Sequence, residues 1–217
     1  KSPGAKIDEW TSIQLGTTYF VDGTKGKIRK LFTSGESILG FQNKGLFKIF
    51  FNSRVQVNTS DGVPIELASS AKIDSTRYIS KEIGSNNKWA IDKFKDGVVF
   101  IDSNRQELFY TNGESLQSIS ETTGCSQWFK ENIYYKDKKW NPIDFDVERV
   151  ISDLSNNDVY IITKDDCIKY SDKLQAFEGR YSYDKTSFMD NINNSLIANR
   201  YTTDSHSDVY SMFDGDY

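Results

Sequence analysis

Short apolar runs bounded by turn residues are the dominant pattern along the chain. Three of them, at 19–21, 98–101 and 159–162, contain only aromatic and β-branched residues. Runs of this length between turn residues predict strands that are covered on both faces. The first and third runs are followed by segments in which apolar and basic residues alternate: basic residues separate Ile28 from Leu31, and Lys169 lies between Ile168 and Tyr170. This second pattern predicts a strand with one face toward solvent.

The hairpin formed by these two patterns recurs along the chain. The first two copies match at Trp10 with Trp89, Phe20 with Phe100, Asp22 with Asp102, Ile28 with Leu108, Gly45 with Gly124 and Phe50 with Phe129. The repeats span about 10–52 and 89–132, and a partial third copy spans 157–177. A fourth stretch, starting at 193, matches by residue type only. Repeats of roughly 40 residues are typical of propellers and solenoids.

The turns and connections carry further signals. Asp22 and Asp102 follow the first strands and predict Asx-turns, in which a carboxylate accepts from the backbone two residues later. Gly23, Gly26 and Asn104 are candidates for positive φ in these turns.

Two other segments predict local structure. The spacing of Trp128, Phe129 and Ile133 predicts a short helix that buries these side chains. The segments 54–57 and 64–69 flank an Asn-Thr-Ser-Asp-Gly turn and predict one more hairpin. The whole chain, 1–217, is therefore predicted to be all-β: a β-propeller-like array of short antiparallel sheets, with one or two short helices in the connections.

Composition supports a folded protein. Of 217 residues, 37% are hydrophobic and 14% aromatic, so the chain has enough apolar surface for a core. The net charge of −4 argues against a dedicated polyanion binder, and no sequence-specific nucleic-acid partner is expected. Two cysteines are too few for a disulfide scaffold. No apolar run approaches the roughly 20 residues of a membrane-spanning helix. Both termini resemble cut ends, which predicts a piece of a longer polypeptide.

Few residues offer catalytic or metal-binding chemistry. His206, the one histidine, lies in a polar loop, so a histidine-based triad or a multi-histidine metal site is not available. Cys125 and Cys167 form no Cys-x-x-Cys motif and are interpreted as packing residues. Asn58 and Asn193 begin Asn-x-Ser/Thr sequons, which are interpreted as turn residues. The sequence therefore predicts no catalytic, cofactor-binding or metal-binding residues.

Two charged segments leave alternatives open. Asp144, Asp146 and Glu148 alternate along a predicted strand, and paired carboxylates are what a glycosidase needs. Solvated side chains on the wet face of a strand explain the same pattern. The basic clusters 25–30 and 136–140 have aromatic neighbours, as in nucleic-acid interfaces, yet the acidic balance favours a solvated surface.

The repeat also carries a family resemblance. The segments 88–133, 150–177 and 180–189 resemble the large tail structural proteins of crAss-like bacteriophages, the muzzle or tail stabilization proteins. The shared pattern is an aromatic strand, an Asp-closed turn, a Gly-aromatic short helix and a final element that is Tyr170, Leu174 and Phe177 here. The resemblance implies a β-propeller-like region of a long virion protein, with no enzymatic residues to carry over.

The sequence leaves three hypotheses about function. The leading hypothesis is a non-catalytic structural module of a phage tail, placed around the genome exit channel, with portal or tail proteins as partners in a symmetric oligomer. It would be located in the virion and assembled in the bacterial host cytoplasm. The second hypothesis is an adhesin that binds host-surface groups or glycans through exposed aromatic side chains. The third is a propeller glycosidase that uses the carboxylates at 144–148.

Overall fold

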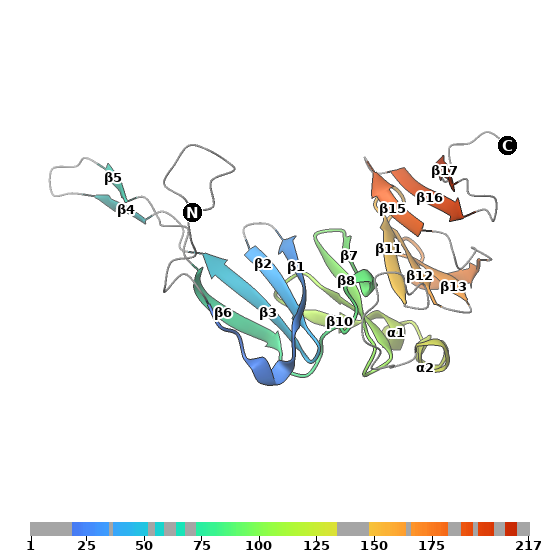
Figure 1. The fold of residues 1–217 in the computed structure, drawn as a ribbon, viewed down its shortest axis with the longest axis horizontal. Coiled ribbons are helices and arrows are strands. Elements are labelled where there is room, and N and C mark those ends of the chain that lie inside the picture. The colour runs from blue at the N-terminus through green and yellow to red at the C-terminus, as the bar shows by residue number, and fades with distance from the viewer. Residues whose placement is uncertain are drawn as a thin grey trace.

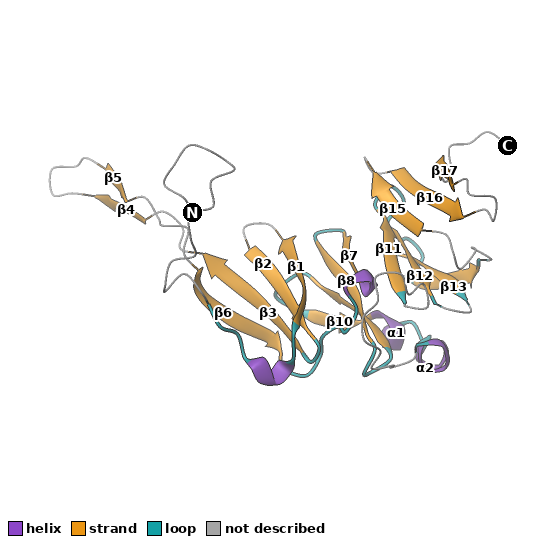
Figure 2. Cartoon of the chain, viewed as in Figure 1, coloured by secondary structure: helices purple, strands orange, loops and turns teal. Residues whose placement is uncertain are grey.

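The computed structural model consists mostly of antiparallel β-sheets (Figures 1 and 2). It describes residues 19–34, 37–51, 55–58, 64–67, 73–133, 148–163, 166–181, 188–192, 195–201 and 207–211. The first sheet has the order β1-β2-β3-β6. Its strands are β1 (Ile28–Ser34), β2 (Ser37–Gln42), β3 (Gly45–Phe51) and β6 (Ile73–Ser80), and the 3-10 helix η1 (Gly23–Lys25) precedes them.

The second and third sheets are four-stranded meanders, in which consecutive strands pair. The second sheet contains β7 (Ile91–Phe94), β8 (Gly97–Asp102), β9 (Glu107–Thr111) and β10 (Leu116–Ser118). The third contains β11 (Arg149–Asp153), β12 (Asp158–Ile162), β13 (Cys167–Ser171) and β14 (Ala176–Arg180). The 3-10 helix η2 (Lys88–Ala90) precedes β7, and α1 (Ile119–Thr122) and α2 (Ser126–Asn132) follow β10.

Two smaller sheets complete the described structure. A fourth sheet of three strands contains β15 (Phe188–Ile192), β16 (Ser195–Tyr201) and β17 (Ser207–Ser211). Strands β4 (Val55–Asn58) and β5 (Pro64–Leu67) pair with each other, which confirms the hairpin predicted between 54 and 69. The first four sheets follow one another along an arc, and β7, β11 and β15 lie toward its concave side (Figure 1).

The inner strands show why successive sheets stack. All six residues of β8 are buried. Val98 and Phe100 belong to an apolar cluster shared with the first sheet, whereas Val99 and Ile101 belong to a cluster shared with the third. Since side chains alternate between the two faces of a strand, β8 contributes to two cores at once. The prediction of strands covered on both faces is confirmed at 98–101.

The third sheet behaves in the same way. In β12, Val159 and Ile161 join the cluster shared with the second sheet, and Tyr160 and Ile162 join a cluster that includes Leu196 of the fourth sheet. The prediction for 159–162 is therefore confirmed. Strand β13 is more buried than predicted, because only Lys169 in it is more than marginally exposed.

The prediction of a strand at 19–21 is wrong. Residues 19–22 form no strand, and the side chain of Phe20 is 86% exposed. The mostly apolar segments 37–42 and 45–51 are longer, and a two-residue connection joins them. They pair with each other instead, and β1 pairs with the first of them. The predicted match of Phe20 with Phe100 therefore joins an exposed residue to one that is fully buried. Trp10 lies outside the described residues.

The predicted turns are mostly confirmed. Asp22 accepts from Thr24 N at 2.9 Å and Asp102 accepts from Asn104 N at 2.8 Å, so both are Asx-turns. Gly26 has a φ of +88°, as predicted, whereas Gly23, the other glycine predicted for this turn, does not have a positive φ. In the second turn, positive φ falls on Gln106 at 58° instead of on Asn104. The four-residue turn between β8 and β9 needs its left-handed residue at the last position before the next strand.

The short helix predicted around 128–133 is confirmed. It is α2, in which Phe129 is fully buried, and Ile133 at its C-terminal end is also fully buried. Trp128 is partly buried and packs against the same cluster. The helix thus fills space between the second and third sheets.

Of the three carboxylates at 144–148 that were predicted to alternate along a strand, the structure describes Glu148, which lies directly before β11.

Candidate functional site

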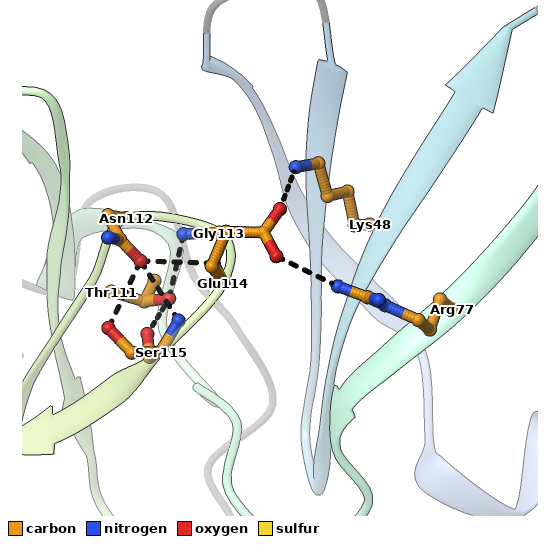
Figure 3. Close-up of polar contacts among 7 residues, drawn as sticks. All are labelled: Lys48, Arg77, Thr111, Asn112, Gly113, Glu114 and Ser115. Carbon is orange, nitrogen blue, oxygen red and sulfur yellow. Dashed lines mark hydrogen bonds and ion pairs between the residues drawn. The ribbon is translucent and has the colours of Figure 1, made fainter.

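The polar side chains that make hydrogen bonds and ion pairs between sheets lie where one sheet meets the next. The loop 112–115 joins β9 to β10 and points toward the first sheet (Figure 3). Asn112 Oδ1 accepts from Glu114 N at 3.0 Å and from Ser115 N at 2.9 Å. Thr111 Oγ1 accepts from Gly113 N at 3.1 Å and donates to the Ser115 carbonyl at 2.7 Å. These bonds satisfy the loop backbone and fix the direction of the Glu114 side chain.

Glu114 joins two cations of the first sheet. One carboxylate oxygen accepts from Lys48 Nζ at 2.8 Å and the other accepts from Arg77 Nη2 at 3.2 Å (Figure 3). Lys48 and then Arg77 hold the pKa of the Glu114 carboxyl below its ordinary value. The side chain of Glu114 is 64% exposed, so solvent screens this contact and its contribution to stability is small.

The two cations would oppose each other without this carboxylate. Lys48 and Arg77 are directly paired across β3 and β6, and like charges in that position are destabilising. The Phe50 ring lies near both, with its centroid 5.5 Å from Lys48 Nζ and 6.0 Å from Arg77 Cζ. The arrangement therefore needs an anion from the neighbouring sheet, and Glu114 supplies it. We call these three charged residues the Glu114 clamp.

A second junction lies in the linker between the first and second sheets. Ser85 N donates to the Gln42 carbonyl at 2.9 Å, and Gly84 N donates to Asp102 Oδ2 at 3.2 Å. Asp102 is fully buried, and burial raises the pKa of its carboxyl, although three backbone N–H groups donate to it. The Asp102 turn therefore also anchors the chain segment that leads from one sheet to the next.

The second and third sheets meet at their first strands. Asp92 Oδ2 on β7 accepts from Ser152 N on β11 at 2.8 Å. Asn87 Nδ2 donates to the Glu148 carbonyl at 2.5 Å, just before β11. Lys95, directly after β7, pairs with Asp172, directly after β13, with Lys95 Nζ 2.5 Å from Asp172 Oδ1. These three interactions link residues in or next to the second sheet with residues in or next to the third sheet. Together they fix the orientation of the two sheets.

The third sheet contains a partly buried charged cluster of its own. Lys169 Nζ lies 3.1 Å from Asp158 Oδ2 and 2.5 Å from Glu178 Oε2, on the two neighbouring strands. Burial alone would lower the pKa of Lys169, but the hydrogen bonds that its ammonium donates to these two carboxylates raise that pKa. Since the ammonium stays charged and paired, this group holds three strands together.

The two cysteines are not suited to nucleophilic chemistry. Cys167 is 1% exposed, and burial, together with nearby Asp166, raises the pKa of its thiol to about 12. Cys125 is half-buried, and burial raises the pKa of its thiol as well. Thiols react as thiolates, so neither side chain is activated at neutral pH.

The other residues considered from the sequence are distributed as follows. Asp144, Asp146, Asn193, His206 and the basic cluster 136–140 lie outside the described residues, and Asn58 is the last residue of β4. In the cluster 25–30, Arg29 donates to Asn43 Oδ1 and Lys30 donates to the Ile91 carbonyl of the second sheet. That cluster is thus partly used in contacts within the chain. Within the described ranges, no group of three or more His, Cys, Asp or Glu residues could hold a metal ion, and no helix could span a membrane.

Sequence reasoning missed the Glu114 clamp. The Asn-Gly-Glu-Ser segment at 112–115 is recognisable as a turn from its residue types. The sequence does not reveal that Lys48 and Arg77, which are 66 and 37 residues away, would lie opposite its carboxylate.

Two comparisons with known proteins agree. The family model of the crassvirus muzzle protein matches residues 1–200. The chain is also 39% identical over 218 residues to the muzzle protein of Bacteroides phage crAss001. That match covers 100% of this chain and 15% of the length of the relative.

Proposed function

Since the chain belongs to the crassvirus muzzle protein family, we propose that it is a structural, non-catalytic module of a phage virion. The single observation that carries this proposal is the use of charged side chains. Glu114, Lys169 and Asp102 each bind groups of neighbouring strands, sheets or linkers. A catalytic site needs charged groups that converge on a space for substrate, whereas these groups converge on one another.

We also propose that the stacked sheets form part of a β-propeller. Each blade of a propeller is a small antiparallel sheet, and successive blades pack face to face around an axis. The second and third sheets are four-stranded meanders that share a core, and their first strands β7 and β11 lie in contact. An arc with the first strands on its concave side supports this arrangement (Figure 1). The internal repeats at about 10–52 and 89–132, with a partial copy at 157–177, remain a prediction.

The proposed location is the tail, around the genome exit channel. There the module would contact portal or other tail proteins within a symmetric oligomer, after assembly in the host cytoplasm. A rigid array of sheets suits this role, because the second and third sheets are each held by a core on both faces and present a fixed surface to partners.

Cross-linking of intact particles, followed by mass spectrometry, tests the proposal. Lys44, Lys93 and Lys130 are exposed and lie on three separate parts of the array, so they are suitable reporters, and exposed Lys95 is a fourth. We expect cross-links from these lysines to portal or tail proteins. Cross-links within the chain, such as between Lys44 and Lys93, are the internal control for a folded module. Recovery of the protein apart from particles, with none of the intermolecular links, would contradict a virion role.

The adhesin hypothesis is the second candidate, and one observation favours it. The Trp89 side chain is 40% exposed, and Lys88 Nζ lies 4.6 Å from its ring centroid. Exposed tryptophans stack on sugar rings, so a glycan array separates the two functions. Binding that is lost in Trp89→Ala would favour the adhesin, and the structural proposal expects no glycan signal.

A further inference from the structure

The fourth sheet has one strand fewer than the second and third sheets. Its order is β15-β16-β17, whereas each of the other two sheets is a four-stranded meander. Strand β15 lies against β11, as β11 lies against β7, so the three sheets stack from their first strands in the same order (Figure 1). Among the described residues, β17 therefore pairs with β16 at one edge and has no strand at its other edge.

Strand β17 corresponds in sequence to the third strands of the second and third sheets. The sequence of β9 is Glu-Leu-Phe-Tyr-Thr, that of β13 is Cys-Ile-Lys-Tyr-Ser and that of β17 is Ser-Asp-Val-Tyr-Ser. Each strand has a tyrosine at its fourth position and a hydroxyl residue at its fifth. The register agrees as well, because each tyrosine pairs with a small or β-branched residue of the second strand: Tyr110 with Val99, Tyr170 with Val159, and Tyr210 with Ala198.

In the second and third sheets, the fourth strand follows this tyrosine at a fixed spacing. A four-residue connection leads from β9 to β10, and another leads from β13 to β14. Gln117 then pairs with Tyr110, and Phe177 pairs with Tyr170, in both cases seven residues after the tyrosine. The rings of Tyr170 and Phe177 have their centroids 5.4 Å apart, so an aromatic pair is accommodated at this position.

The outer edge of β17 differs from the outer edges of the other sheets. Edge strands of native proteins are commonly short, bulged or charged, which prevents pairing with another chain. Strand β10 has three residues, β14 has a register shift and Gly179 at a φ of +37°, and β6 has two register shifts. Strand β17 pairs with β16 at five consecutive positions without a shift and contains no Lys, Arg, Pro or Gly. Its charged residue, Asp208, pairs in register with Arg200. Strand β17 thus has the character of an inner strand.

We propose that the polypeptide from Asp216 onward forms the fourth strand of this sheet, antiparallel to β17, with Tyr217 opposite Tyr210. Residues 212–215 are then the four-residue connection, as in the second and third sheets; residues 212–217 lie outside the described residues. The curated relative is a much longer polypeptide, of which this chain matches 15%, and such a polypeptide can continue the strand. The inference rests on the proposed stacked-sheet architecture and not on the location of the protein in a tail.

Disulfide trapping in the complete muzzle polypeptide, carrying the present segment, tests this register. In a Cys125→Ser background, Tyr210→Cys and Tyr217→Cys are introduced together. Directly opposite residues of antiparallel strands have Cβ atoms about 5 Å apart on one face, within reach of a disulfide after a small adjustment. Peptide mass spectrometry after mild oxidation identifies which cysteines are joined, and thermal unfolding confirms that each variant is folded.

Two further pairs calibrate the yield. Tyr110→Cys with Gln117→Cys is the equivalent pair of the second sheet and is the positive control. Val209→Cys with Tyr217→Cys is the matched negative control, because neighbouring residues of a strand face opposite sides of the sheet. It moves one cysteine by a single residue, so it also reports on cysteines that meet only through motion of the chain.

In a monomeric fraction, we expect the Tyr210→Cys, Tyr217→Cys pair to form at least about tenfold more disulfide than the negative control, close to the yield of the positive control. Equal yields in the pairs that contain Tyr210→Cys and Val209→Cys would overturn the inference. A disulfide that forms only between two polypeptides would assign the edge of β17 to a second copy, and would overturn it too.

Hydrogen exchange of the unsubstituted polypeptide tests the inference even if the cysteine variants do not fold. In an edge strand of an antiparallel sheet, alternate N–H groups point away from the one neighbour, whereas in an inner strand every N–H group faces a neighbour. We expect slow exchange at all five residues of β17 and at Tyr217 in the monomer. Alternating slow and fast exchange along β17 would contradict the proposal. Neither experiment depends on the particle cross-links, so failure here is distinguishable from failure of the virion role.

Discussion

The contact between the second and third sheets differs in kind from the contact between the first and second. Among the described residues, thirteen buried side chains form the core shared by the second and third sheets, against seven between the first and second. The helices α1 and α2 supply Ile119 and Phe129 to the larger core. In the part of the chain that the structure describes, no helix contributes a buried residue to the smaller core, which has the Glu114 clamp at its rim.

This difference teaches that similar four-stranded sheets can be joined by different physical means. The larger contact depends on apolar area, which contributes about 25 cal/mol per Å² and is insensitive to salt. The smaller contact adds exposed ion pairs, which are weak and are screened by salt. We therefore expect the first sheet to separate from the array under milder conditions than the third.

Removing a ring from the larger core should have the greatest effect. Phe129 is fully buried, and its ring centroid lies 5.6 Å from that of Phe177. We expect Phe129→Ala to lower the free energy of unfolding by about 3–5 kcal/mol, because it leaves a cavity that the sheets on either side cannot fill. Urea denaturation measures this change. Phe20→Ala, at an exposed site, is the control and should change stability by less than about 0.5 kcal/mol. Equal effects of the two variants would show that α2 does not support the contact.

Adding a methyl group to the linker should weaken the contact of the first sheet. A Cβ atom on Gly84 would lie 2.1 Å from the Gln42 carbonyl oxygen and 2.6 Å from Gly45 N. Both are backbone atoms of the first sheet, so the linker has to move. We expect Gly84→Ala to lower the free energy of unfolding by about 1–3 kcal/mol.

The control for this prediction is Gly23→Ala, since a Cβ atom at Gly23 meets nothing within 4 Å. Hydrogen exchange of both variants locates the change. Faster exchange should be confined to β2, β3 and the linker in Gly84→Ala, and exchange spread evenly over the third sheet would argue against two separable contacts.

Removing the Asp92 carboxylate should have an intermediate effect on the larger contact. Its Oδ2 accepts a hydrogen bond from Ser152 N. A backbone N–H group that is left without an acceptor in the folded protein lowers the free energy of unfolding by about 1–3 kcal/mol. Asp92→Ala should therefore destabilise the protein within that range. Asp92→Asn retains an oxygen acceptor and should be closer to the wild type. The exchange rate of the Ser152 amide checks the assignment, and an unchanged rate in Asp92→Ala would exclude this bond as a support of the contact.

The Glu114 clamp should give the smallest effect and the clearest dependence on conditions. The pKa of Glu114 is lowered in the folded chain, so its ionised form stabilises the fold above the ordinary value of 4.5. That contribution is lost as the pH falls through the lowered folded pKa. Glu114→Gln should thus lower the Tm slightly at pH 7 and low salt, and match the wild type at high salt or strongly acidic pH.

Thermal unfolding at pH 7 and pH 3, with and without salt, measures this difference. Glu121→Gln, at an exposed position on α1, is the control for a generic change of charge. A Tm difference between Glu114→Gln and the wild type that persists at high salt would mean that packing of the loop, and not charge, joins the first and second sheets.

The predictions of inner strands were correct in the second and third sheets and wrong next to the first sheet. The runs at 98–101 and 159–162 were recognised as inner strands because every residue in them is apolar, and both are buried. The run at 19–21 has the same composition but is exposed, because the longer segments at 37–42 and 45–51 take the strand positions. A short apolar run does not show whether a better partner competes for the sheet.

Local chemistry was predictable at the turns as well. Asp22 and Asp102 form their Asx-turns as expected, since such a bond needs only residues that are neighbours in the sequence. The clamp was not predictable, since Glu114 meets Lys48 and Arg77 only after two sheets have docked.

The sequence by itself determined the β-rich class, the inner strands at 98–101 and 159–162, the helix at 126–132 and the hairpin at 55–67, because alternation, turn chemistry and helical spacing act over a few residues. Only the tertiary structure decided which strands make up the first sheet, which faces are shared and which charges meet. Those features depend on groups brought together from tens of residues apart, where packing area and paired charge outweigh any local preference.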